Sequence, residues 1–118
     1  MKSKISSLSK SEDFKNLLKG RKISNPYSTI FFKKITTKNN KLLNISFVTK
    51  KKIGNAVKRN KIKRRLRNIM NDAIKTINMN LNYSYLFIAK KNIYDANYKM
   101  IKDSIIKDLI KVKWLKWL

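Results

Sequence analysis

The chain has 118 residues, of which 30 are Lys or Arg and only six are Asp or Glu, so its formal net charge is +24. It contains no Cys and no His, which excludes disulfides, thiolate metal sites and the usual general base near neutral pH. This length suits a single domain, residues 1–118, with one modest core. Such a charge favours a polyanionic partner, with nucleic acid first and an anionic membrane surface second.

The ends of the chain carry no targeting or membrane signal. No apolar run approaches the length needed to cross a bilayer, and the N-terminus has charge without an apolar signal core. We therefore expect a cytoplasmic protein. Residues 1–8 are polar, and we expect them to form a flexible tail. Residues 111–118 are either a second flexible tail or a last turn of the final helix, and we favour the helical turn.

The first predicted element is a short helix over residues 9–19. Ser9 and Glu12 have capping-box spacing, and Gly20 suits the end of the helix. Its apolar side is formed by Phe14, Leu17 and Leu18.

Strands are predicted next. Asn25-Pro26 indicates a turn, and residues 28–35 are rich in β-branched and aromatic side chains, which favours a strand. Residues 37–41 read as a polar connection in which Asn39-Asn40 is a candidate hairpin turn. In residues 42–49 apolar and polar side chains alternate, which is typical of a half-buried strand.

A long helix is predicted from Asn55, a good N-cap residue, to about Asn78. At about 100° per residue, one arc of this helix is apolar: Ile62, Leu66, Ile69, Met70, Ala73 and Ile77. A neighbouring arc carries Arg59, Asn60, Lys63, Arg64 and Arg67, while Lys61 and Arg65 lie on the far flank. One side of the helix should therefore pack on a core while the next side presents cations.

The last third of the chain predicts a loop around residues 80–82, a central strand and a final helix. The strand, residues 83–89, is a continuous apolar and aromatic run. Asp95 can cap the helix, whose apolar positions are Tyr98, Ile101, Ile105, Leu109 and Val112. The predicted fold is α+β, a two-layer sandwich of helices over a small sheet.

The acidic residues do not form an active site. A metal nuclease made of protein needs clustered carboxylates or histidines, but only Glu12 and Asp13 are adjacent. Asp103 and Asp108 are five residues apart, which is poor spacing for one helical face. We therefore expect no catalytic residue and no metal ligand in the protein.

The stretch from residue 50 to residue 68 resembles the signature of the bacterial ribonuclease P protein family, and looser similarity extends from Leu8 to Leu109. Every position of the signature is present: Lys51, Lys52, Gly54, Asn55, Ala56, Val57, Arg59, Asn60, Lys63, Arg64 and Arg67. The similarity also includes Ser11-Glu12-Asp13-Phe14 and residues 86–91.

The resemblance implies the element order α-β-β-β-α-β-α with a left-handed β-α-β crossover around the long helix. It also implies a protein subunit of an endoribonuclease that removes the 5′ leader of precursor tRNA, with chemistry performed by a catalytic RNA and Mg²⁺. The partners would be that RNA and precursor tRNA, with no membrane and no required protein partner. RNA contacts would come from Lys51, Lys52, Asn55, Arg59, Asn60, Lys61, Lys63, Arg64 and Arg67.

In this family the first helix and the sheet form a cleft for the leader strand. The resemblance places Phe14 in that cleft, and Leu18 at a position where other members often have an aromatic residue. The sheet would contribute Phe32 or, with the register shifted by one residue, Phe31, because alternate side chains face opposite sides. Lys90 is either a phosphate contact at the cleft or a charged strand end.

Two other functions fit part of the sequence. A general RNA- or DNA-binding protein, such as a ribosomal protein, would explain the charge alone. A membrane-surface protein would use the tail from Lys111 to Leu118, where Trp and Lys alternate. The same tail can stack on bases or pack its Trp residues on the core as a last helical turn.

Overall fold

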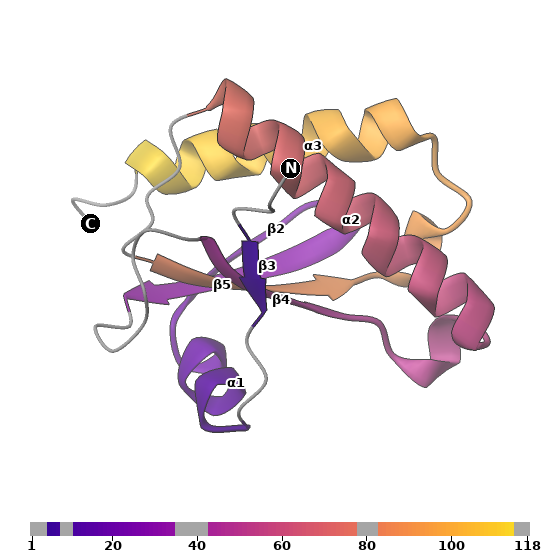
Figure 1. Cartoon of the computed structure of the whole chain (residues 1–118), viewed down its shortest axis with the longest axis horizontal. Helices are drawn as coiled ribbons and strands as arrows, with labels where there is room; N and C mark the ends of the chain where they lie inside the picture. Colours follow the sequence, from indigo (N-terminus) through magenta and orange to yellow (C-terminus); the bar gives the residue numbers. More distant parts are fainter. Residues whose placement is uncertain (1–4, 8–10, 35–42, 78–82, 115–118) are drawn as a thin grey trace.

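The computed structural model describes residues 5–7, 11–34, 43–77 and 83–114. The strands are β1 (Ile5–Ser7), β2 (Arg21–Ser24), β3 (Ser28–Lys34), β4 (Leu43–Val48) and β5 (Tyr83–Ala89). The helices are α1 (Ser11–Leu18), α2 (Ala56–Thr76) and α3 (Tyr98–Trp114), with short 3-10 turns at Lys51–Ile53 and Lys91–Ile93. The predicted α+β class and the order of elements from α1 onwards are confirmed (Figure 1).

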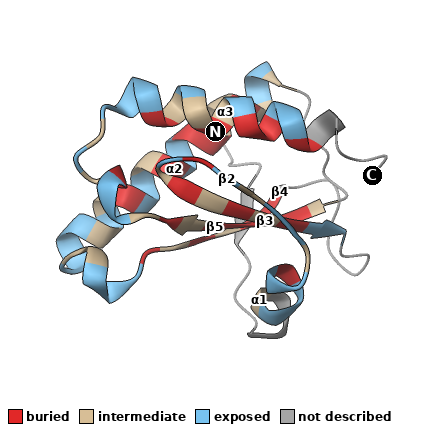
Figure 2. Ribbon diagram, turned by 180° about the vertical axis from the view of Figure 1, so that it is seen from behind, coloured by how far each residue is buried: buried red, intermediate tan, exposed pale blue. Residues whose placement is uncertain are grey.

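The five strands form one sheet in the order β1-β4-β5-β3-β2. Because β5 lies between β3 and β4, these two strands do not pair, and the hairpin considered at Asn39-Asn40 is wrong; those two residues lie outside the described ranges. The predicted central strand, β5, pairs parallel with β4 and antiparallel with β3, while β2 and β3 form an antiparallel hairpin through the predicted turn at Asn25-Pro26. Since β4 and β5 are parallel neighbours, α2 is the crossover between them. Helices α2 and α3 cover one face of the sheet and α1 lies on the other (Figures 1 and 2).

The predicted flexible N-terminus is partly wrong, because β1 pairs parallel with β4 through Ile5 and Leu43. Three residues are too few to show strand periodicity, so this strand is recognised only from its pairing with β4 in the structure. At the other end, α3 continues to Trp114 and Val112 is buried, so residues 111–114 are helical as favoured, while residues 115–118 lie outside the described residues.

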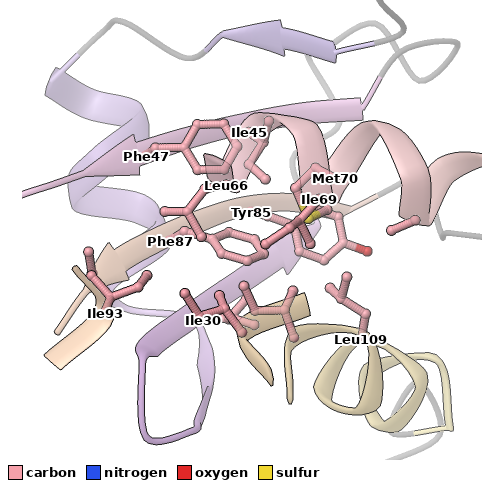
Figure 3. Packing of buried hydrophobic residues seen from close by; sticks show 14 of the residues in the cluster. Ile30, Ile45, Phe47, Leu66, Ile69, Met70, Tyr85, Phe87, Ile93 and Leu109 are labelled. Atoms are coloured by element: carbon pink, nitrogen blue, oxygen red, sulfur yellow. The ribbon is translucent and has the colours of Figure 1, made fainter. Parts of the chain in front are cut away.

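The main core lies between the sheet and the two helices α2 and α3. The apolar arc of α2 is buried as predicted: Ile62, Leu66, Ile69, Met70 and Ala73. These side chains meet β4 and β5, where Phe47 and Phe87 pack with ring centroids 5.7 Å apart (Figure 3). Burial, and then the neighbouring Tyr83, raise the pKa of the Tyr85 phenol, which therefore stays neutral inside the core.

Two details of the helix ends differ from expectation. The residue that caps α3 is Asn97 rather than Asp95, because the Asn97 side-chain oxygen accepts a hydrogen bond from the Lys99 amide at 2.8 Å. Gly20 follows α1 as predicted, but without a positive φ. A Cβ atom at Gly20 would lie 2.6 Å from the carbonyl oxygen of Phe32, so glycine allows the end of α1 to approach β3 closely.

Candidate nucleic-acid interface

The start of α2 sets the direction of its charged side chains. The Asn55 side chain accepts from the Lys58 amide at 3.0 Å, which confirms the predicted N-cap. Gly54 has an extended backbone, and a Cβ atom there would lie 2.8 Å from Cδ of Lys58. The turn thus carries the chain from the exposed Lys51 and Lys52 into α2 with its first turn capped.

The predicted cationic arc of α2 faces outward. Four of its residues are exposed: Asn60, Lys63, Arg64 and Arg67. The three cations among them, Lys63, Arg64 and Arg67, pair with no carboxylate in the described part of the chain. Their direction follows from the buried arc, which packs the adjoining side of α2 against the sheet. We call Arg59, Asn60, Lys63, Arg64 and Arg67 the α2 ridge. It presents several charge-assisted donors in one direction, as repeated contact with phosphates requires.

Arg59 differs from the rest of the ridge because it is half-buried. Its Nε atom is buried and has no hydrogen-bond partner among the described residues. The stem of this arginine therefore lies beside the core, which limits where its guanidinium group can point. An arginine held in this way keeps its donors in place for a bidentate acceptor such as phosphate.

Lys61 does not lie with the ridge. Its ammonium group is 5.7 Å from the centre of the Tyr94 ring, and that of Lys58 is 4.9 Å from the same ring. Arg65 donates to the Tyr94 carbonyl oxygen at 3.5 Å. The three cations on this flank of α2 thus all contact Tyr94, which lies in the loop before α3. Sequence periodicity places the three cations together, but it gives no sign of Tyr94.

The sheet face beneath α1 has an apolar patch of the predicted kind. Phe14 packs with Leu17, Phe31 and Leu86, and the half-buried Val48 and Ile88 extend the same patch. Leu18 is 53% exposed at its edge. We use the name α1 cleft for this apolar sheet face beside α1, the place where the family resemblance predicts a cleft.

The assignment of Phe32 to this cleft is wrong, and Phe31 takes its place. Phe32 is 2% exposed and belongs to the core on the α2–α3 side, where its ring meets Tyr83 edge-on at 5.8 Å. Phe31 is half-buried on the α1 side. The pairing of Phe31 with Leu86 and of Phe32 with Tyr85 decides the register.

A pocket of about 470 Å³ lies at the end of this sheet face nearest the start of α2. Its apolar lining includes Ile53 and Ile88, and its cations are Lys50, Lys52, Lys90 and Lys91. Lys90, a predicted cleft residue, therefore lies at a cationic pocket that joins the sheet to the segment preceding α2.

Lys90 is also held in position by the turn between β2 and β3. Its ammonium group donates to the Asn25 carbonyl oxygen at 2.8 Å, and its amide donates to the Tyr27 carbonyl oxygen at 2.8 Å. The buried Asn25 side chain donates to Asp108 of α3 at 2.8 Å and accepts from the Ser28 amide. This network ties the turn to α3 and fixes one wall of the pocket, and the sequence pattern did not reveal it.

A metal ion in a protein needs several donor side chains close together. In residues 11–34, 43–77 and 83–114, no three His, Cys, Asp or Glu side chains come close enough to hold one. The helices in these ranges also include none that is long and apolar enough to span a bilayer.

Comparison with known proteins adds to this geometry. Residues 2–113 match the family model described as Ribonuclease P. A ribonuclease P protein component from Fusobacterium nucleatum is 38% identical over 115 residues, which cover 92% of this chain and 94% of that relative.

Solved structures show the same fold. The Staphylococcus aureus RNase P protein matches with a TM-score of 0.75 at 24% identity, covering 91% of this chain and 94% of that one. The Thermotoga maritima RNase P protein matches with a TM-score of 0.74 at 21% identity, covering 88% and 94% of the two chains. With the family match extending over nearly the whole sequence, the chain belongs to the ribonuclease P protein family.

Proposed function

We propose that this protein is the protein subunit of ribonuclease P and promotes removal of the 5′ leader from precursor tRNA. The observation that carries the proposal is the α2 ridge, a set of outward-facing cations on a helix fixed by its buried side. Exposed Lys63, Arg64 and Arg67 would hold phosphates of the catalytic RNA, and Asn60 would hydrogen-bond its backbone or a base. The exposed Lys51, Lys52 and Asn55 would extend this contact around the start of α2.

The α1 cleft would hold the leader strand. Phe14 and Phe31 offer apolar surface on which unpaired bases can stack, and Lys90 lies at the cationic pocket farther along the same sheet face. A single strand lying along this surface would contact the aromatic rings of Phe14 and Phe31 in one part and the lysines of the cationic pocket, including Lys90, in another. This arrangement suits a substrate whose bases are unpaired, and a folded tRNA body has few of those.

The chemical step is assigned to the RNA. The described residues offer no cluster of metal ligands. The RNA subunit would therefore hold Mg²⁺, which would activate the attacking water. The protein then contributes affinity and orientation. As tRNA maturation takes place where tRNA is transcribed, we expect the protein in the cytoplasm.

The test is reconstitution with a bacterial ribonuclease P RNA at low magnesium, scoring cleavage of precursor tRNA with and without this chain. We expect the protein to raise the cleavage rate and to bind leader-bearing tRNA more tightly than mature tRNA in the presence of the RNA. Replacing Arg59, Arg64 and Arg67 together with Gln should abolish assembly at low protein concentration. Equal affinity for the two tRNAs, with no gain in cleavage, would instead favour a general RNA-binding protein.

A further inference from the structure

A second cationic pocket lies at the other end of the β3–β5 ladder and includes no residue of the family signature. Its volume is about 420 Å³, and its cations are Lys19, Arg21, Lys33 and Lys34. The other pocket reaches Thr29 on β3, three residues before Phe32, so the two regions are separated by about 10 Å along the strand. The pockets share no lining residue and are separate sites.

The fold brings these cations together from three elements. Lys19 follows α1, and Gly20 lets this turn approach β3 so closely that a Cβ atom would lie 2.9 Å from Cβ of Lys33. Arg21 begins β2 and pairs with Phe32, so Lys33 and Lys34 of β3 extend beyond the first residue of β2. Successive side chains on a strand point to opposite faces. Lys33 and Lys34 are both exposed and therefore point to opposite faces at this end of the sheet.

The pocket also has an aromatic lining. Tyr83 is half-buried and meets Phe32 edge-on, with the two rings at 71° and their centres 5.8 Å apart. Because Phe32 is fixed in the core, the Tyr83 ring is held at the pocket by a rigid neighbour. Lysines at an open strand end are common protection against edge pairing, but that role needs no aromatic ring beside them.

These features match the requirements of single-stranded RNA binding. Cations that track a backbone and an aromatic ring that stacks on a base are the two recurring parts of such sites, and the volume is in the range of small-ligand pockets. No carboxylate is found among the described lining residues, so the ammonium groups of Lys19, Lys33 and Lys34 repel one another until a polyanion is bound.

We propose that this pocket is a second RNA-binding site, in which Lys19, Lys33 and Lys34 hold phosphates and Tyr83 stacks on an unpaired base. The inference rests on the proposed function only in that the protein works on RNA. The strand that occupies the site belongs either to the leader or to an unpaired segment of the catalytic RNA, which share the same chemistry.

The test is a Lys19→Gln/Lys33→Gln/Lys34→Gln variant. Its matched control is Lys99→Gln/Lys107→Gln/Lys111→Gln, which removes the same charge from exposed positions of α3. Binding is measured against three probes over a range of salt: the catalytic RNA alone, a single-stranded leader oligonucleotide, and precursor tRNA with a short or a long leader on the assembled holoenzyme. At about 0.7 per phosphate contact on a single strand, the site variant should lower the salt slope by about 2 and the affinity at 0.1 M salt about 100-fold relative to the control.

The probes identify the strand. A loss seen with the catalytic RNA alone assigns the site to that RNA, and a loss seen only with long leaders assigns it to the leader. Tyr83→Leu should weaken binding to the same probe, while Tyr83→Phe should keep it. If the site variant matches its control on every probe, the proposal is overturned, whereas the cleavage assay would still report on the proposed function. If only Tyr83→Leu has no effect, the stacking contact is refuted.

Discussion

Neutralising the exposed cations of the α2 ridge tests the interface most directly. The variant Lys63→Gln/Arg64→Gln/Arg67→Gln removes three charges that are exposed and make no ion pair in the described chain. The buried side of α2 is unchanged, so the free energy of unfolding should stay within about 0.5 kcal/mol per substitution. Any loss of binding then comes from lost RNA contacts and not from unfolding.

The size of the loss follows from counterion release. Each phosphate contact on a duplex contributes about 0.9 to the slope of log K against log salt, so three contacts contribute about 2.7. The affinity for the catalytic RNA should then fall about 500-fold at 0.1 M salt, but only about 25-fold at 0.3 M. A loss that is independent of salt would point to a different cause, such as a distorted helix.

The assay is equilibrium binding to the catalytic RNA at several salt concentrations, with thermal unfolding measured in parallel. The control is again Lys99→Gln/Lys107→Gln/Lys111→Gln, which has the same net charge as the ridge variant. We expect the control to bind within a few-fold of the unchanged protein. Equal losses in the two variants would refute the reasoning, because net charge alone, without the direction of the ridge, would then explain the affinity.

Three further predictions concern the cleft, the glycines and the buried phenol. Phe31→Ala should weaken binding of leader-bearing precursor tRNA with little loss of stability, whereas Phe32→Ala should cost about 3–5 kcal/mol of unfolding free energy by leaving a cavity; binding assays and denaturant unfolding separate the two. Gly20→Ala should destabilise the fold by about 1–3 kcal/mol because its Cβ meets backbone, while Gly54→Ala meets only a flexible side chain and should cost less in the same unfolding assay. Burial raises the pKa of the Tyr85 phenol in the folded state, so its contribution to stability is fully present below the unfolded pKa of about 10 and is lost progressively as pH rises above that value. The difference in unfolding free energy between the unchanged protein and a Tyr85→Phe variant should therefore shrink as pH rises past about 10. A difference that stays constant with pH would contradict this.

Local signals in the sequence predicted most of the elements. The signals at Asn25-Pro26, at Asn55 and along the apolar arc of α2 all depend on neighbouring residues in the chain. The structure confirms the turn, the N-cap and the arc except for Ile77, which is half-buried. The outward direction of Lys63, Arg64 and Arg67 follows from that arc, because helical geometry ties the exposed side to the buried one.

Contacts between distant segments were beyond the reach of sequence patterns. Strand β1 forms by pairing with the outer edge of β4, and three residues carry too little pattern to predict it. The choice between Phe31 and Phe32 needed the register of β3 on β5, since both residues are aromatic and side chains alternate between faces. The same limit applies to Asn25, whose buried side chain reaches Asp108 of α3, 83 residues farther along the chain.

The sequence by itself determined that this protein has an amphipathic helix with a cationic side, because periodicity and capping act over a few residues. Only the tertiary structure decided which aromatic side chains lie in the α1 cleft, where Lys90 is held, and that Lys19, Lys33 and Lys34 line one pocket with Tyr83. Those arrangements depend on strand register and on the packing of segments far apart in the chain, neither of which is encoded in any short stretch of residues.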